Sequence, residues 1–342
     1  MKSFLAALSG CLMVAGLAGS TNAIAQSTAG ALQPVSFISS DPTLTSALVY
    51  VVKSKGFDKA HAIDMSVART GMSSSLQLDA VIAGHADFAA PGTQTALQAI
   101  RSGADLKIIA SIANNQLAAV ISNNALKKID VSSTAPIADR LRAMKGMTIA
   151  TNPVGATYYQ MFRAYLKQYG LDPDTDVRLV PLGDSSAMIS GLQYGRYDAI
   201  VSASGVVEQA MGLNAGSLWF SGARGDLPGA DSTVVCVVIA RSETVQKHPE
   251  EVEAVRAAFA DALNFVHNDR EAAGQMLKAE YFPKFDPTVW KLVWDGATAA
   301  YPATLTFPQK AFQYWTEIDP KGAPSYKDVE YKSVTYRAAQ NP

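Results

Sequence analysis

The sequence predicts an α/β fold in which two similar lobes each hold a mostly parallel β-sheet flanked by helices. Three observations lead to this prediction. The chain has 342 residues, 48% of them apolar, which is enough for about two globular domains with cores of their own. Short runs rich in β-branched residues alternate with helical patterns, as in βαβ units. Finally, a group of residues in the first half is echoed later in the chain.

In each copy of this echo a strand leads through a hydroxyl-rich loop into a helix, followed by Gly-x-x-Asp and a further strand. The first copy contains Ser74, Ser75, Gly84 and Asp87, and the second contains Ser185, Ser186, Gly195 and Asp198. Glycine suits the left-handed position that ends a helix, and aspartate suits the turn that opens the next strand. The repeat indicates equivalent places in two lobes, with chance similarity of so few residues as the alternative.

The elements follow in order along the chain. Pro42 fits the first turn of the first helix, with Asp41 and Thr43 beside it. Alternation and β-branched content predict strands at 35–39, 63–68, 87–90 and 106–112, and then at 147–150, 177–181, 199–202 and 233–240. Helical patterns fill 44–55, 74–83, 95–102, 157–169 and 186–194, and then 249–267, 270–280, 287–299 and 307–318. The last twenty or so residues are expected to wrap over the surface.

Charge and cysteine content narrow the function. The net charge is −1 and the basic residues are scattered, so we expect no nucleic-acid partner and no anionic membrane surface as a partner. One of the two cysteines, Cys236, lies in a β-branched apolar run that is typical of a buried strand. Its thiol is therefore interpreted as packing, and no disulfide framework, catalytic thiol or cofactor is expected.

The first 25 residues resemble a cleavable signal peptide. Lys2 supplies a positive start, residues 4–19 are apolar or small, and Ala23 and Ala25 form an A-x-A site before Gln26. The apolar stretch is too short and too rich in small residues for a membrane span. We therefore expect export to the periplasm with cleavage after Ala25, and lipidation at Cys11 is the less favoured alternative.

Loops at the carboxyl ends of the strands should hold any ligand, because open α/β sheets bind there. These loops are rich in hydroxyls, amides and glycines, and several precede helices, whose free N–H groups attract anions. Helix capping explains many of the same side chains without a ligand. The candidate ligand-binding residues are Ser39, Ser40, Thr43, Ser74, Thr93, Asn115, Gly155, Thr157, Tyr158, Asp184, Ser185 and Ser204.

Several stretches resemble the periplasmic solute-binding proteins of nitrate, sulfonate and taurine ABC importers, also called the SsuA/THI5-like or NMT1 superfamily. Residues 53–65 resemble the pattern KGxFxxxGLDV, 145–150 resemble KGKxIA, 152–157 resemble the glycine loop before a helix, and 195–199 resemble GxxDA. The matches run from about residue 35 to 210. His61 and Ala62 depart from the family's Gly-Leu, and Ala203 to Gly205 stand where many members carry a proline.

The resemblance implies a two-lobed clamshell (a type II periplasmic-binding-protein fold). Lobe I would comprise 26–121 and 234–342, and lobe II 122–233. It also implies that a small anionic molecule binds in the cleft, and that closure presents the lobes to an inner-membrane ABC permease. We expect a monomeric, non-catalytic carrier of a sulfonate or carboxylate, with an aromatic ligand among the options.

Two other functions stay open at this point. A pyrimidine-related enzyme of the same superfamily would need a cysteine cluster and metal-binding histidines, whereas the four histidines here lack metal-ligand spacing. A periplasmic sensor domain on the same fold would look identical in sequence. Arg69, Arg101 and Arg224 lie near the predicted loops but are interpreted as solvated, and Trp219, Phe220, Tyr158 and Tyr159 are candidates for an aromatic wall.

Overall fold

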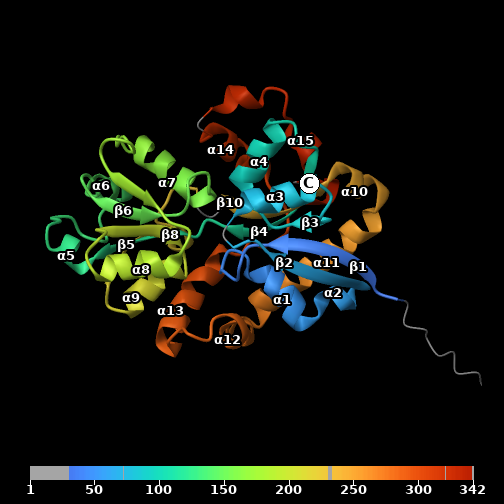
Figure 1. Ribbon diagram of the computed structural model, residues 1–342, viewed down its shortest axis with the longest axis horizontal. Helices are drawn as coiled ribbons and strands as arrows, with labels where there is room; N and C mark the ends of the chain where they lie inside the picture. The colour runs from blue at the N-terminus through green and yellow to red at the C-terminus, as the bar shows by residue number, and fades with distance from the viewer. Residues whose placement is uncertain (1–30, 72, 230–232, 320, 341–342) are drawn as a thin grey trace, which may run out of the picture. The chain divides into compact units, whose positions relative to one another are not determined.

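Two five-stranded β-sheets organise the chain (Figure 1). The computed structural model describes residues 31–71, 73–229, 233–319 and 321–340, and 32–342 form one compact unit. The first sheet has the order β2-β1-β3-β10-β4, with β1 Gln33–Ser39, β2 Ile63–Arg69, β3 Phe88–Ala89, β4 Leu106–Asn114 and β10 Val234–Arg241. The second has the order β7-β6-β8-β5-β9, with β5 Leu117–Ser122, β6 Thr148–Thr151, β7 Arg178–Pro181, β8 Ala199–Ala203 and β9 Gly216–Ser221.

Both sheets have the same pattern of strand directions. In the first, β1 runs parallel to β2 and β3, and β10 runs antiparallel to β3 and β4. In the second, β6 runs parallel to β7 and β8, and β5 runs antiparallel to β8 and β9. Each sheet therefore has one reversed strand in the fourth position, and the predicted α/β class with mostly parallel sheets is confirmed.

The echoed aspartates have equivalent roles in the two sheets. The Asp87 carboxylate accepts a hydrogen bond from Ser36 N–H (2.9 Å), while its own N–H donates to Ser36 O (3.0 Å). The Asp198 carboxylate accepts from Thr148 N–H (2.9 Å), and its N–H donates to Thr148 O (2.8 Å). In both copies an aspartate thus ties the chain entering the third strand in the sheet order, β3 or β8, to the second strand, β1 or β6, which agrees with an internal repeat.

Helices cover both faces of each sheet. Figure 1 shows α6 and α7 on one side of the second sheet and α8 and α9 on the other. Around the sheets lie α1 Ala47–Lys55, α2 Phe57–Ala60, α3 Ser74–Ile82, α4 Thr93–Arg101, α5 Asn123–Leu126, α6 Ile137–Arg142, α7 Thr157–Gln168, α8 Ser185–Gln193 and α9 Val206–Gly212. The C-terminal part contains α10 Ser242–Lys247, α11 Pro249–Asn268, α12 Arg270–Tyr281, α13 Pro287–Ala297, α14 Gln309–Glu317 and α15 Tyr331–Val334. None of the described helices is both long and apolar enough to cross a membrane.

Two strands of the second sheet, β5 and β9, are not among the predicted strands. Both are short; β5 is buried throughout and β9 is buried in its second half, so neither shows the polar alternation of a half-exposed strand. Strand β5 pairs with β8 and β9, although the predicted boundary of lobe I falls at residue 121 inside it. The lobe boundaries stay a prediction, while the pairing places the whole of β5 in the second sheet.

The C-terminal segment is anchored rather than only wrapped over the surface. Thr335 forms a bridge with Ile108 of β4, and Ala339 is fully buried. The Tyr331 hydroxyl donates to Phe307 O (2.7 Å). The sequence, with its many lysines, predicted that this segment wraps over the surface. Its tyrosines and small residues instead supply buried contacts.

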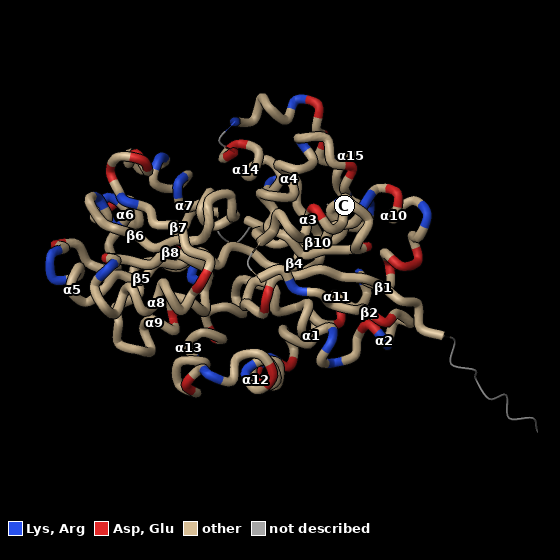
Figure 2. The backbone as a smooth tube through the Cα atoms, in the orientation of Figure 1, with Lys and Arg blue, Asp and Glu red and all other residues tan. Residues whose placement is uncertain are grey.

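Charged residues are distributed over many elements. Figure 2 shows Lys and Arg interspersed with Asp and Glu along the helices and turns of both sheets. This distribution agrees with the near-zero net charge of the chain. The chemistry of any ligand site therefore depends on local groups.

Candidate functional site

Three helices begin at one place between the two sheets without a side-chain cap. The residues that precede α1, α4 and α7 are Ser46, Gly92 and Ala156, and none of them accepts a capping hydrogen bond from the helix it starts. By contrast, Ser73 caps α3 through Leu76 N–H. Uncapped first-turn N–H groups and the positive end of the helix dipole favour an anion or another acceptor.

The loop before α1 is longer than predicted. We expected the helix to begin at residue 44, but it begins at Ala47. The Ser46 hydroxyl instead organises the loop, donating to Asp41 O (3.2 Å) and accepting from Thr43 N–H (3.2 Å). Local hydroxyl-to-backbone bonds of this kind compete with helix formation. The consequence is that Thr43, Thr45 and Ser46 remain in a loop at the edge of the sheet.

A cavity of about 70 Å³ lies among these helix starts. Its walls come from both sheets and their loops. Its polar lining consists of Ser40, Thr43, Thr45, Ser46, Ser74, Gln77, Asn152, Thr157 and Tyr158, and Cys236 closes one side. We call this space the polar cavity.

The elements of the two sheets touch across the polar cavity. The hydroxyls of Thr45, before α1, and Tyr158, in α7, are 2.9 Å apart. Gly92 lies so close to Thr157 that a β-carbon at position 92 would be 2.1 Å from the Thr157 Oγ1 atom. In this structure the two halves of the site are therefore in direct contact.

Gln77 holds two loops of this site together. With its amide nitrogen toward Ala90 O (2.8 Å) and its oxygen toward Ser40 N–H (2.9 Å), the buried side chain satisfies both backbone groups. These two hydrogen bonds therefore fix the loops after β1 and β3 relative to each other. Such a fully satisfied buried amide gives a rigid wall rather than a ligand contact.

Two polar side chains of the cavity have no hydrogen-bond partner among the described residues. These are Asn152 Oδ1 and Thr157 Oγ1, and both residues are almost completely buried. Most buried polar atoms in proteins are hydrogen-bonded, because leaving one unpaired costs about 1–3 kcal/mol. Unpaired groups facing a cavity at uncapped helix starts are therefore suited to a polar ligand.

Neutral groups supply the polarity of this cavity among the described residues. The lining residues that the structure describes include no Lys, Arg, Asp or Glu. Burial raises the pKa of the Tyr158 hydroxyl, so this group stays protonated at neutral pH. Any anion held here would be stabilised by hydroxyls, amides and helix dipoles without a formal countercharge.

Burial also controls the one thiol of the site. It raises the pKa of the Cys236 thiol to about 12, and Sγ contacts Ala90 O at 3.5 Å. At pH 8 roughly one molecule in ten thousand would then carry the thiolate, which is the reactive form.

In a Cys11→Ser variant we expect maleimide to label the native protein far more slowly than the chain unfolded in guanidinium. Equal labelling rates in the two states would contradict this prediction.

The structure brings most of the candidate residues to cavities between the sheets. Ser40, Thr43, Ser74, Thr157 and Tyr158 line the polar cavity. Gly155 lines an adjoining space of about 220 Å³ that also includes Ser74. Ser185 and Ser204 line another space, of about 190 Å³, that includes Thr43. Their role in binding stays a prediction.

The other candidates lie outside these three spaces. Ser39 and Thr93 are fully buried beside the polar cavity, at the end of β1 and the start of α4. Asn115 accepts from Leu117 N–H (2.9 Å) and packs against Gly222. Asp184 caps α8 by accepting from Ser186 and Ala187 N–H. Asn115 and Asp184 thus have backbone partners that account for their positions.

The three arginines near the predicted loops do not line these spaces either. Arg69 lies over the ring of Tyr50, with 5.2 Å between its guanidinium carbon and the ring centre, and Arg224 is exposed. Arg101 forms an ion pair with Asp319 at 2.6 Å, and both side chains are buried. The expectation of a solvated Arg101 is therefore wrong, because its partner lies far away in the sequence.

The aromatic wall comes from residues that sequence reasoning missed. Trp219 and Phe220 are buried in the core, and Tyr159 packs under Arg163. The rings that line the 190 Å³ space are those of Phe282, Phe285 and Trp290, around the start of α13. They lie far from the strand-end loops in sequence, so only their aromatic clustering could have drawn attention to them.

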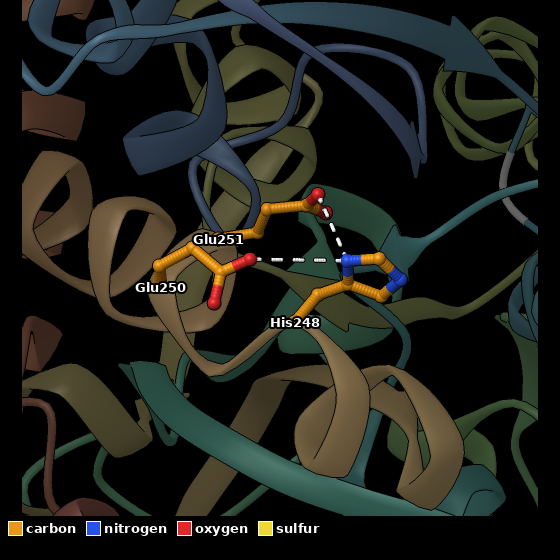
Figure 3. A group of neighbouring side chains, drawn as sticks. All are labelled: His248, Glu250 and Glu251. Carbon is orange, nitrogen blue, oxygen red and sulfur yellow. Dashed lines mark ion pairs between the residues drawn. The ribbon is translucent and has the colours of Figure 1, made fainter.

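One histidine has two carboxylates close by. Figure 3 shows His248, Glu250 and Glu251 at the start of α11, where His248 Nδ1 is 3.8 Å from a Glu250 oxygen and 3.4 Å from a Glu251 oxygen. The three could approach a metal ion. Two of them are exposed, Glu251 also accepts from Gln33 (3.0 Å), and the positive end of the α11 dipole opposes a cation. The arrangement fits a surface ion-pair group.

Solved structures with the same fold include three that cover most of this chain. A protein from Bordetella bronchiseptica RB50 matches with 18% identity and a TM-score of 0.73, over 89% of this chain and 94% of that chain. The periplasmic nitrate-binding protein NrtA from Synechocystis PCC 6803 matches with 14% identity and a TM-score of 0.71, over 90% and 87%. The alkanesulfonate-binding protein SsuA from Xanthomonas axonopodis pv. citri, bound to MOPS, matches with 14% identity and a TM-score of 0.66, over 90% and 98%.

At these identities the likeness establishes the fold. Among curated proteins none matches the chain in sequence. A family model does match, from residue 39 to 279, which is more than half of the chain and spans strands of both sheets. The superfamily resemblance inferred from the motifs is confirmed by this match: the chain belongs to the NMT1-like family.

Proposed function

We propose that this protein is the extracytoplasmic solute-binding component of an ABC importer. It captures a small organic anion, a sulfonate or a carboxylate, between its two lobes and delivers it to a permease. The observation that supports this most is the polar cavity, where three uncapped helix starts meet the unpaired side chains of Asn152 and Thr157. Solved structures of the same fold include proteins described as nitrate-binding and alkanesulfonate-binding.

Ligand binding would stabilise closure because the donors come from both halves of the site. Ser40 and the start of α1 belong to the first sheet, whereas Asn152 and Thr157 belong to the second. An anion that accepts from both sets links them, and the Thr45–Tyr158 contact at 2.9 Å adds to the link. A ligand can shift the open–closed equilibrium only by its extra affinity for the closed form, and such bridging supplies it.

Catalysis is not proposed for this cavity. Its described lining residues include no carboxylate, histidine or lysine, and burial keeps the Cys236 thiol and the Tyr158 hydroxyl protonated. General acid–base or nucleophilic chemistry needs a group that changes protonation state near neutral pH. Binding and release is the activity that these neutral groups suit.

Alanine substitutions on the two sides test the two-lobe site. A thermal-shift screen of sulfonates, aliphatic and aromatic carboxylates, nitrate and pyrimidines first identifies the ligand, because tight binding raises the melting temperature. Ser40→Ala and Thr157→Ala should each then weaken binding by about 1–3 kcal/mol in calorimetric titration, through loss of a donor to a charged group. Thr157 Oγ1 has no hydrogen-bond partner within the described part of the chain, so the stability of the free protein should change little.

Ser190→Ala is a matched control, since Ser190 is exposed on α8. It should bind like the wild type. If both Ser40→Ala and Thr157→Ala also bind like the wild type, the proposed site is wrong.

Export completes the proposal. The predicted signal peptide, residues 1–25, lies outside the described residues, and we propose that it directs the protein to the periplasm with Gln26 as the mature N-terminus. Intact mass of the protein from a periplasmic extract measures this directly. A chain that retains Met1, or one that begins with a lipid-bearing Cys11, would contradict the proposal.

A further inference from the structure

The polar cavity adjoins a second space of different chemistry. This second space, of about 190 Å³, shares Thr43 and Ala203 with the polar cavity, so the two adjoin. Its apolar walls include Leu44, Val206, Phe282, Phe285, Trp290 and Val293, while Thr43, Ser185, Ser204 and Gln209 are its polar lining. We call it the aromatic cavity. From this juxtaposition we infer that the ligand is amphiphilic: its anionic head lies in the polar cavity and an apolar tail of several carbon atoms lies in the aromatic cavity.

The aromatic wall is a packed cluster. The rings of Phe282 and Trp290 stack with centres 5.0 Å apart, and Phe285 meets them edge-on at 5.9 and 5.6 Å. The Trp290 indole N–H donates to Gly274 O (3.0 Å), so its polar group is satisfied away from the cavity. The surface offered to a ligand is therefore carbon, which favours an alkyl or aromatic group over a polar one.

The opposite wall belongs to the second sheet. Val206 begins α9 and lines the aromatic cavity across from the rings. Helix α9 packs on α13 at Gly212, where a β-carbon would lie 2.3 Å from Val289 Cγ2, so the two helices lie close together here. In this arrangement an apolar tail would contact both halves of the site, as an anionic head does in the polar cavity.

The polar end explains why the head must be small. The polar cavity holds only about 70 Å³, and its polarity comes from neutral donors. A compact oxyanion such as a sulfonate or carboxylate fits this chemistry, while the bulk of a larger molecule must extend elsewhere. Thr43 and Ala203 line both spaces, so the aromatic cavity is a neighbouring place for that bulk. The inference rests on the proposed function and adds the tail to it.

A homologous series measures the tail contribution. We would titrate the protein with methanesulfonate, butanesulfonate, hexanesulfonate and benzenesulfonate, and with acetate, hexanoate and benzoate. Affinity should rise about fourfold for each methylene that enters the aromatic cavity. Phe285→Ala should reduce the affinity ratio of hexanesulfonate to methanesulfonate about tenfold and leave methanesulfonate binding within threefold of the wild type.

Phe312→Ala is the matched control. Phe312 is also half-buried and packs against one ring, that of Tyr331 at 6.1 Å, but it lies outside the two cavities. It should leave the affinity ratio unchanged. If Phe285→Ala does not fold, Val206→Ala makes the same test from the opposite wall.

The possible outcomes separate this inference from the proposed function. If methanesulfonate or acetate binds and affinity does not rise with chain length, the inference is overturned and the proposed function stands. The inference is also overturned if Phe285→Ala and Phe312→Ala lower the affinity ratio of hexanesulfonate to methanesulfonate equally. If no member of either series binds, the proposed function fails and the inference fails with it.

Discussion

Replacing Gly92 by alanine should weaken ligand binding roughly fivefold to more than a hundredfold with little change in the stability of the free protein. The new β-carbon would lie 2.1 Å from Thr157 Oγ1 and 3.1 Å from Thr157 Cβ, across the polar cavity. Overpacking of this kind costs about 1–3 kcal/mol, which corresponds to that range of affinity. The backbone at Gly92 has φ −64° and ψ 137°, which alanine adopts without strain. The clash therefore arises only when the two halves are in contact.

A double-mutant cycle with Thr157→Gly separates this clash from other effects. In the Thr157→Gly background the obstructing side chain is gone, so adding Gly92→Ala should cost little further affinity. Calorimetric titration with the ligand found in the screen gives the four affinities, and scattering of the ligand-bound forms reports closure. An equal loss from Gly92→Ala in both backgrounds would show that contact between positions 92 and 157 is not what limits closure.

Replacing Asp319 by alanine should lower the free energy of unfolding by about 3–5 kcal/mol, because it leaves a buried guanidinium without its partner. The Asp319 carboxylate pairs with Arg101 at 2.6 Å and also accepts from Gln98 (3.1 Å) and Tyr326 (2.8 Å). These contacts join α4, whose first residues lie beside the polar cavity, to the C-terminal segment. Denaturant unfolding followed by circular dichroism measures the change.

Asp174→Ala provides a matched control, since Asp174 pairs with Arg163 at the same 2.6 Å but is exposed. Exposed pairs contribute about 0–1 kcal/mol, so this variant should be nearly as stable as the wild type. Equal destabilisation by the two substitutions would show that burial of the Asp319 pair is not the cause.

The pH dependence gives the Asp319 prediction a second readout. Burial alone would raise the pKa of this carboxyl, but hydrogen bonds from Lys321 N–H, Arg101 and Tyr326 outweigh it and hold the pKa below its ordinary value. A lowered pKa contributes stability that is fully present above the unfolded-state value of about 3.9 and is lost as the pH falls through the folded-state value. The stability advantage of the wild type over Asp319→Asn should therefore shrink in acid below about pH 4. A constant difference down to pH 2 would contradict this.

Much of the fold could be read from local patterns. The β-branched run around Cys236 is the buried strand β10, and the Gly-x-x-Asp repeat marks two equivalent strand entries at Asp87 and Asp198. These predictions succeeded because strand burial, helix ends and tight turns depend on neighbours in sequence. Strands β5 and β9 were missed because their buried, mixed composition has no distinctive period.

The candidate site was predictable only in part. Ser40, Thr43, Ser74 and Thr157 line the polar cavity because strand ends in an α/β sheet meet at one edge, a rule that the chain order alone reveals. Gln77 and Asn152 belong to the same cavity. Asn152 begins the predicted glycine loop 152–157 but was not among the candidates, and nothing in the local sequence of Gln77 distinguishes it from a surface amide.

The sequence by itself determined the α/β class, the family resemblance and the hydroxyl-rich loops at the strand ends, since each depends on residue types at short spacing. Only the tertiary structure decided that Arg101 pairs with Asp319, that Gly92 touches Thr157, and that the rings around Trp290 wall the aromatic cavity. The partners in each case lie far apart in the chain. Their meeting depends on how whole sheets and helices pack, and packing is a property of shape in three dimensions that no local pattern of residues encodes.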